Sequence, residues 1–151
     1  MAPARPITPA ELSVIEALAA LAIEPIDLTD VGTARVAFMD DGGMGSIAID
    51  PARPHGPLRA AALGEASDRD GTVLSLCLFI DETGRPRELD VWKVDFSPLI
   101  TLPDPADIVP GPDPLHPPDQ APTAPAPSAA SRTAPRSRPR PVGTGGRTRP
   151  G

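Results

Sequence analysis

The chain has 151 residues, of which 14 are basic and 20 acidic, so its formal net charge is −6. A single cysteine, Cys77, excludes an internal disulfide, and no run approaches the roughly 20 apolar residues that a membrane-spanning helix needs. Because the first residues also lack the pattern of a signal peptide, we expect a soluble, cytoplasmic protein with no membrane contact.

A helix is predicted to begin near residue 8. Thr8 and Glu11 have the spacing of a capping box, in which each side chain binds the other residue's amide. Pro9 falls at the first helical position, where its missing N–H costs nothing. Glu24-Pro25 is expected to end the helix. An apolar stripe at helical spacing lies between these signals and consists of Leu12, Ile15, Leu18 and Ala22, with Val14 and Leu21 beside them.

After about residue 32 the apolar residues alternate with a period of two, which predicts strands. The candidate strands are residues 34–39, 47–49, 63–67, 72–80 and 87–96, with turn-forming residues between them. Short strands joined by tight turns favour antiparallel pairing. We therefore predict an α+β fold over residues 6–102, with the N-terminal helix packed on an antiparallel four- to five-stranded meander sheet.

Two segments of this domain carry a resemblance. Residues 39–46 (MDDGGMGS) and 88–99 (ELDVWKVDFSPL) resemble a family of small bacterial domains of unknown function, over roughly residues 6–102. This resemblance implies no activity. The acidic and apolar strand that ends in Lys-Val-Asp also resembles, more loosely, the small immunity-type proteins that bacteria encode beside toxins.

The glycine-rich loop at residues 42–45 is a poor phosphate site. Phosphate loops lie before a helix and end in lysine, whereas this loop lies between two strands and follows Asp40 and Asp41, which would repel an anion. We interpret it as a hairpin turn. The alternative is a surface loop that lets a partner's backbone approach closely.

Metal and nucleophile chemistry lack suitable residues. A calcium loop starting at Asp68 would need a carboxylate where Phe79 stands, and His55, His116 and Cys77 cannot form a transition-metal set. Cys77, in the most apolar strand, is expected to be an inert core residue. We therefore expect no metal, no cofactor and no enzymatic activity, although twenty carboxylates leave an acid–base pair open.

The segment 92–96 (WKVDF) allows two interpretations. In a strand Trp92, Val94 and Phe96 share one face, while Lys93 and Asp95 share the other. The first interpretation places the Trp92 face in the core, so that Lys93, the only lysine, pairs on the exposed face with Asp95 or a turn acid. The second keeps Trp92 partly exposed as an anchor for a partner, because tryptophan is enriched at binding hot spots.

The C-terminal third of the chain differs in composition. Residues 103–151 contain 14 of the 23 prolines, and residues 121–151 contain six arginines and no acid. Such a segment cannot bury enough apolar surface to fold, so we predict a disordered tail rich in Pro, Ala and Arg. The tail could make weak, nonspecific contacts with anionic surfaces, fold back on the acidic domain, or serve only as a solvated extension.

The sequence thus predicts a non-enzymatic protein-binding module whose unknown partner is basic, in its most specific form an immunity-type neutraliser of a toxin. The alternative is a nucleic-acid accessory protein that acts through the basic tail. The partner-binding residues predicted for the module lie in the glycine-rich loop and the last strand: Asp40, Asp41, Gly42, Gly43, Met44, Trp92, Lys93 and Asp95.

Overall fold

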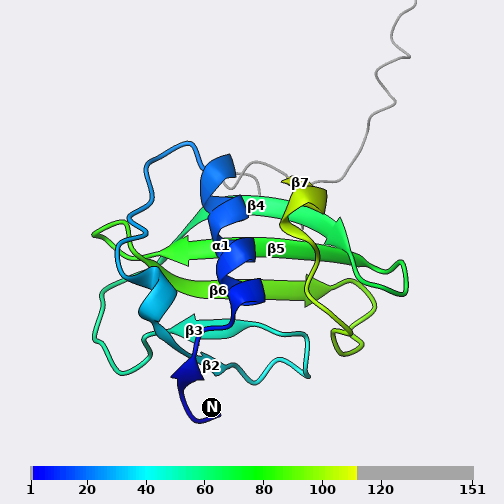
Figure 1. Cartoon of the computed structure of the whole chain (residues 1–151), viewed down its shortest axis with the longest axis horizontal. Helices are drawn as coiled ribbons and strands as arrows, with labels where there is room; N and C mark the ends of the chain where they lie inside the picture. Colours follow the sequence, from blue (N-terminus) through cyan, green and yellow to red (C-terminus); the bar gives the residue numbers. More distant parts are fainter. Residues whose placement is uncertain (1, 112–151) are drawn as a thin grey trace, which may run out of the picture. The chain divides into compact units, whose positions relative to one another are not determined.

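A computed structural model describes residues 2–111 of the chain, which form one antiparallel sheet with helices on one side (Figure 1). The sheet order is β1-β2-β3-β6-β5-β4-β7. Its strands are β1 (Arg5–Pro6), β2 (Arg35–Phe38), β3 (Ile47–Ile49), β4 (Arg59–Ser67), β5 (Val73–Ile80), β6 (Pro86–Lys93) and β7 (Val109–Pro110). The predicted α+β class and the antiparallel pairing are confirmed.

The strand count and order differ from the predicted four- to five-stranded meander. Seven strands pair, and β3 lies beside β6 rather than beside β4. The connection after β3 therefore takes the chain across the sheet before β4, β5 and β6 run back in sequence. Strands β1 and β7 were missed because each has two residues, one of them proline, and so shows no alternation.

Helix α1 (Pro9–Leu21) begins as its sequence predicts. The Glu11 amide donates to Thr8 Oγ1 at 3.1 Å and the Thr8 amide donates to Glu11 Oε1 at 2.9 Å, which completes the capping box. Arg5 of β1 binds the same carboxylate, so Glu11 joins the helix start to the edge strand. Ala22 is already extended, three residues before Pro25. No helix within residues 2–111 is long and apolar enough to cross a membrane.

The core lies between α1 and the sheet. Figure 1 shows the helix crossing one face, over β4, β5 and β6. We call this side the helix face and the other side the outer face. Both short 3₁₀ helices, η1 (Val31–Thr33) and η2 (Pro105–Asp107), also lie against α1. The central core residues are Val14, Ile15 and Leu18 of α1 with Leu74, Leu76, Leu78, Leu89 and Val91 of the sheet.

Regular structure continues beyond residue 102, where the sequence places the start of the tail. Ile108 joins the hydrophobic core, and β7 pairs with Gly64 and Glu65 of β4. The Gly111 amide then donates to the Leu63 carbonyl at 2.8 Å. The rest of the predicted tail, with its six arginines, lies outside the described residues, as does the nucleic-acid hypothesis that depends on it.

Candidate protein-interaction site

Lys93, at the end of β6, is buried on the helix face. Its side chain is 1% exposed, and its Nζ lies 2.8 Å from Asp68 Oδ2, 2.9 Å from Asp70 Oδ2 and 3.2 Å from the Pro98 carbonyl. The expectation of an exposed lysine paired with Asp95 was wrong, while pairing with acids of the 68–71 turn was correct. Burial is tolerated because two carboxylates neutralise the ammonium group and three acceptors satisfy it.

Asp68 is the centre of this arrangement. Its carboxylate also accepts from the amides of Arg69, Ile100 and Thr101 at 2.7–3.1 Å. Burial by itself raises the pKa of Asp68, but the Lys93 ammonium and these amides outweigh it and hold the pKa well below its usual range. The buried pair therefore fixes the chain on both sides of residues 94–99.

The two segments that carry the family resemblance contact each other. The Leu99 amide donates to the Gly43 carbonyl at 2.9 Å, and the Lys93 amide points at Met44 Sδ at 3.3 Å. Ser46 Oγ donates to Asp90 Oδ1 at 3.0 Å and accepts from the Val91 amide at 2.9 Å. The glycine-rich loop thus supports β6, and the hairpin interpretation holds.

The predicted partner-binding residues divide into supporting and exposed groups. Met44 and Lys93 are buried, and the Asp41 carboxylate accepts the amides of Gly43, Met44 and Ser46 within its own loop. These amides lower the pKa of Asp41 against the opposing effect of burial. The exposed group consists of Asp40, Gly42, Gly43, Trp92 and Asp95.

Trp92 lies on the outer face of β6, away from the core. The alternation predicted along residues 89–93 is correct, but the first interpretation, which buried Trp92, chose the wrong side. Leu89 and Val91 fit against Leu76 and Leu78 of β5 under the helix, so Trp92 must point outward. The second interpretation, a partly exposed Trp92, agrees with its exposure of 44%.

Trp92 belongs to an apolar cluster that we call the aromatic patch: Val73, Trp92, Val94 and Phe96, which are 42–64% exposed. The Trp92 and Phe96 rings meet edge to face with centroids 4.8 Å apart. The Val94 amide donates to the Val73 carbonyl, which brings the two strand ends together. Val73 was not among the predicted partner-binding residues, although the alternation in β5 places it on the same side as Cys77.

The turn under the patch is tightly held. The Phe96 amide donates to the Lys93 carbonyl at 2.8 Å, and the Asp95 carboxylate accepts both the amide and the hydroxyl of Ser97. Phe96 has a φ of 65°, in the left-handed region that a bulky side chain avoids. Such strain persists only where surrounding contacts impose it, and it concentrates at functional sites.

Carboxylates continue along the outer face of β6. Glu88 and Asp90 precede Trp92 at two-residue intervals, and Cys77 of β5 is paired with Asp90 in register. Burial and these two negative charges raise the pKa of the Cys77 thiol to about 12. The thiol is therefore uncharged and a poor nucleophile, as expected, although it lies on the outer face and not in the main core.

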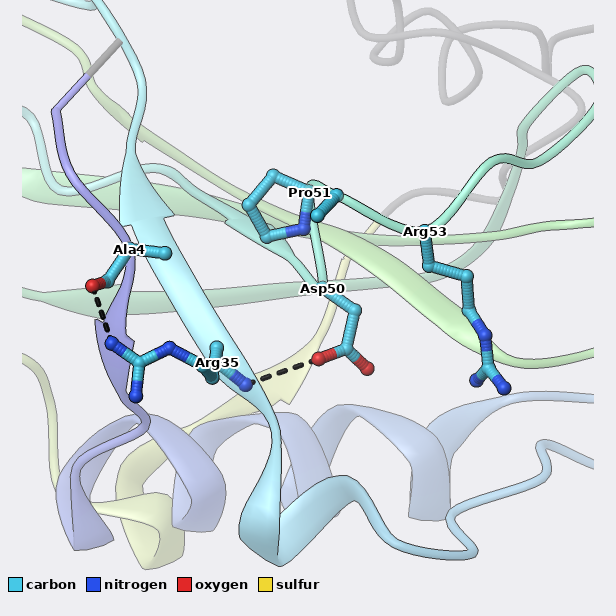
Figure 2. A pocket seen from close by; sticks show the side chains of 6 residues that line it. Ala4, Arg35, Asp50, Pro51 and Arg53 are labelled. Carbon is cyan, nitrogen blue, oxygen red and sulfur yellow. Dashed lines mark hydrogen bonds between the residues drawn. The ribbon is translucent and has the colours of Figure 1, made fainter.

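A surface pocket of about 390 Å³ lies beside the edge strand β1, the start of β2 and the end of β3 (Figure 2). Figure 2 shows that Arg35 and Asp50 are committed to local structure, because Arg35 Nη2 donates to the Ala4 carbonyl and the Arg35 amide donates to Asp50 Oδ1. We therefore regard it as a packing feature. Within residues 2–111 no group of three His, Cys, Asp or Glu side chains could hold a metal ion.

Comparison with known proteins identifies the domain but not its role. Neither the curated proteins nor the solved structures contain a match to this chain. A family model described as a domain of unknown function (DUF6984) matches residues 4–103, which include α1, strands β1–β6 and both contacting segments. The chain therefore belongs to the DUF6984 family, as the resemblance of its two motifs to a family of uncharacterised domains predicted.

Proposed function

We propose that the domain is a non-enzymatic protein-binding module that contacts its partner through the aromatic patch. The observation that carries the proposal is the exposed Trp92–Phe96 pair, held on a strained turn by the buried Lys93–Asp68 ion pair. Only four of the 151 residues are aromatic, so two of them together at the surface are unusual for this chain. Tryptophan at the centre of a contact typically carries a large share of its binding energy.

Rigidity of the patch favours this role. Binding costs free energy for every side chain and loop that must be ordered, so a surface that is already fixed binds more tightly. Hydrogen bonds from Ser97 and Phe96, together with the Lys93 contact to the Pro98 carbonyl, hold the turn before any partner arrives. The strain at Phe96 is the cost of presenting its ring beside Trp92.

The surroundings of the patch favour a basic partner. Asp70 and Asp95 lie in the turns that flank it, and Glu65 is in the same cross-strand row as Trp92, through Ser75. Arg69 is the basic residue of those turns, so acids predominate. A negative rim accelerates association with a positive surface and rejects acidic competitors. A basic toxin neutralised by this surface is the most specific form of the proposal, and it derives from the sequence likeness alone.

The decisive experiment compares single substitutions in the full chain. Proteins captured from the native host by the wild type should be lost with Trp92→Ala and retained with Ile23→Ala, a control whose residue is 93% exposed outside the patch. For a purified partner we expect Trp92→Ala to weaken binding by at least about 30-fold, as for a hot-spot residue. Equal binding by both variants would reject the patch as the contact surface.

Charge reversal tests the nature of the partner. Glu65→Lys, at an exposed position on the outer face, should slow association at low salt, whereas Glu16→Lys on the exposed side of α1 should change it little. Asp41 is unsuitable for this purpose because its carboxylate holds the glycine-rich loop. An association rate that does not respond to Glu65→Lys would argue against a basic partner while leaving the patch itself in place.

A further inference from the structure

Three side chains form a line on the outer face of β6. Glu88, Asp90 and Trp92 point to the same side because they alternate with the core residues Leu89 and Val91. Successive members of the line are about 6.6–6.8 Å apart, twice the rise of an extended residue. No helix of the described region lies on this face, since α1, η1 and η2 all lie on the other one.

The environment of Glu88 disfavours its charged form. Burial on the sheet and the neighbouring Asp90 raise the pKa of Glu88, and His55 opposes the shift. Asp90 accepts a hydrogen bond from Ser46, and within residues 2–111 no basic side chain forms an ion pair with Glu88 or Asp90. By contrast, two of the three buried carboxylates of the described region, Glu11 and Asp68, each bind a cation.

We propose that the partner inserts an extended basic segment along this line, with two cationic side chains at alternate positions against Glu88 and Asp90 and an apolar side chain against Trp92. The inference rests on the proposed function and specifies what the partner presents. An extended segment repeats its side chains at the same 6.6–6.8 Å interval and on one side, so all three contacts form together. The cations would supply the charge that the outer face lacks.

Other modes of recognition fit less well. In a helix, residues four apart are about 6.0 Å apart and each is rotated by about 40° from the last, so a third contact drifts away from the line. Strand addition is blocked at Glu88, where the β6 main chain already lies between β3 and β5. The segment therefore lies across the outer-face side chains.

Trp92 is the only tryptophan of the chain, so its fluorescence reports on this surface in the full-length protein. The probe is a short capped peptide with two arginines at alternate positions and a leucine two residues further. Control peptides of the same composition place the arginines consecutively or four residues apart. We expect the alternating peptide to bind about tenfold more tightly than either control, and equal affinities would overturn the proposal.

Substitutions in the protein give a second, independent readout. Glu88→Gln should weaken the alternating peptide about tenfold, while Glu16→Gln on α1 should have no effect. Affinity should rise with pH as Glu88 ionises. This rise should be smaller in Glu88→Gln, where Asp90 and Cys77 are the titratable groups that remain, but should persist in full in His55→Gln. A pH dependence that follows His55 instead would contradict the assignment.

The chain's own arginines provide the competing occupant. Replacing Arg136, Arg138 and Arg140 by glutamate should leave peptide affinity unchanged, whereas tighter binding would show that this segment already occupies the face and would overturn the assignment to an external partner. If the peptide tests fail but Trp92→Ala still abolishes partner capture, the extended basic segment is rejected and the proposed function stands. Loss of the Trp92 effect on capture would reject the proposed function itself.

Discussion

The two faces of strand β6 differ in whether their charged side chains have partners of opposite charge. On the helix face Lys93 is almost completely buried, yet two carboxylates and a carbonyl satisfy it. On the outer face Glu88 and Asp90 are only half-buried, yet no basic side chain of residues 2–111 pairs with them. The cation at this end of the helix face is therefore satisfied within the domain, whereas the two anions of the outer face have no basic partner among residues 2–111.

The largest expected effect on stability comes from removing the Asp68 carboxylate, which pairs with Lys93 on the helix face. Asp68→Ala should lower the free energy of unfolding by about 3–5 kcal/mol, because it leaves the Lys93 ammonium buried beside a single, partly exposed carboxylate. Chemical denaturation measures the loss. The double variant Asp68→Leu with Lys93→Met should recover only part of it, since the apolar pair removes the uncompensated charge but leaves the amides that Asp68 accepted without an acceptor.

Acid denaturation provides the control for that variant. The pKa of Asp68 is lowered in the folded state, so its stabilisation is complete above the unfolded value near about 4 and is lost as the pH falls through the folded value. The wild type should therefore lose stability steeply below about pH 4, and Asp68→Ala should lose less over the same range. An identical slope in both proteins would contradict the ion pair.

The next test concerns the contact between the two family motifs. Gly45 has a φ of 100°, and a Cβ there would lie 2.8 Å from Leu99 Cδ2. Gly45→Ala should destabilise the domain by about 2–3 kcal/mol, from backbone strain and a steric clash together. Gly42→Ala is the matched control, because Gly42 has a φ of 76° but no atom within 4 Å of its Cβ position. It should show the strain alone, about 1 kcal/mol, and equal losses would argue against the close packing of Leu99.

A smaller effect is expected on the outer face, with the opposite sign. The raised pKa of Glu88 means that its charged form is disfavoured in the folded state, so folding is opposed above that pKa and this penalty disappears at lower pH. Glu88→Gln should raise stability at pH 7 by less than about 1 kcal/mol, because solvent screens a half-exposed group. The gain should vanish below about pH 4, where the carboxyl is protonated in both states.

The substitution with the smallest expected effect on stability tests whether Phe96 serves partner binding and not folding. Phe96→Asn relieves the left-handed strain but loses the edge contact with Trp92, and the two effects, each about 1 kcal/mol, should nearly cancel. Thermal unfolding should therefore hardly change while partner binding falls. A loss of stability as large as that of Asp68→Ala would mean that Phe96 is a structural residue and not part of a contact surface.

Local patterns predicted much of the fold. The capping box at Thr8 and Glu11 set the start of α1, and the turn residues after β4 and β5 set the two hairpins, because these signals act between neighbours in the sequence. The alternation along β6 was also correct. Edge strands β1 and β7 gave no signal, since two-residue strands form only when a longer strand offers its free edge.

Alternation along the chain is enough to predict that β6 has two chemically different faces, with Leu89, Val91 and Lys93 on one and Glu88, Asp90 and Trp92 on the other. Which of the two faces is buried depends on contacts with distant parts of the chain. A period of two predicts which residues share a side, but not which side faces the core. Lys93 can turn inward only because Asp68, 25 residues earlier, is brought beside it when β4 and β6 pair with β5. The exposure of Trp92 follows from that distant partner and not from any residue near it in the chain.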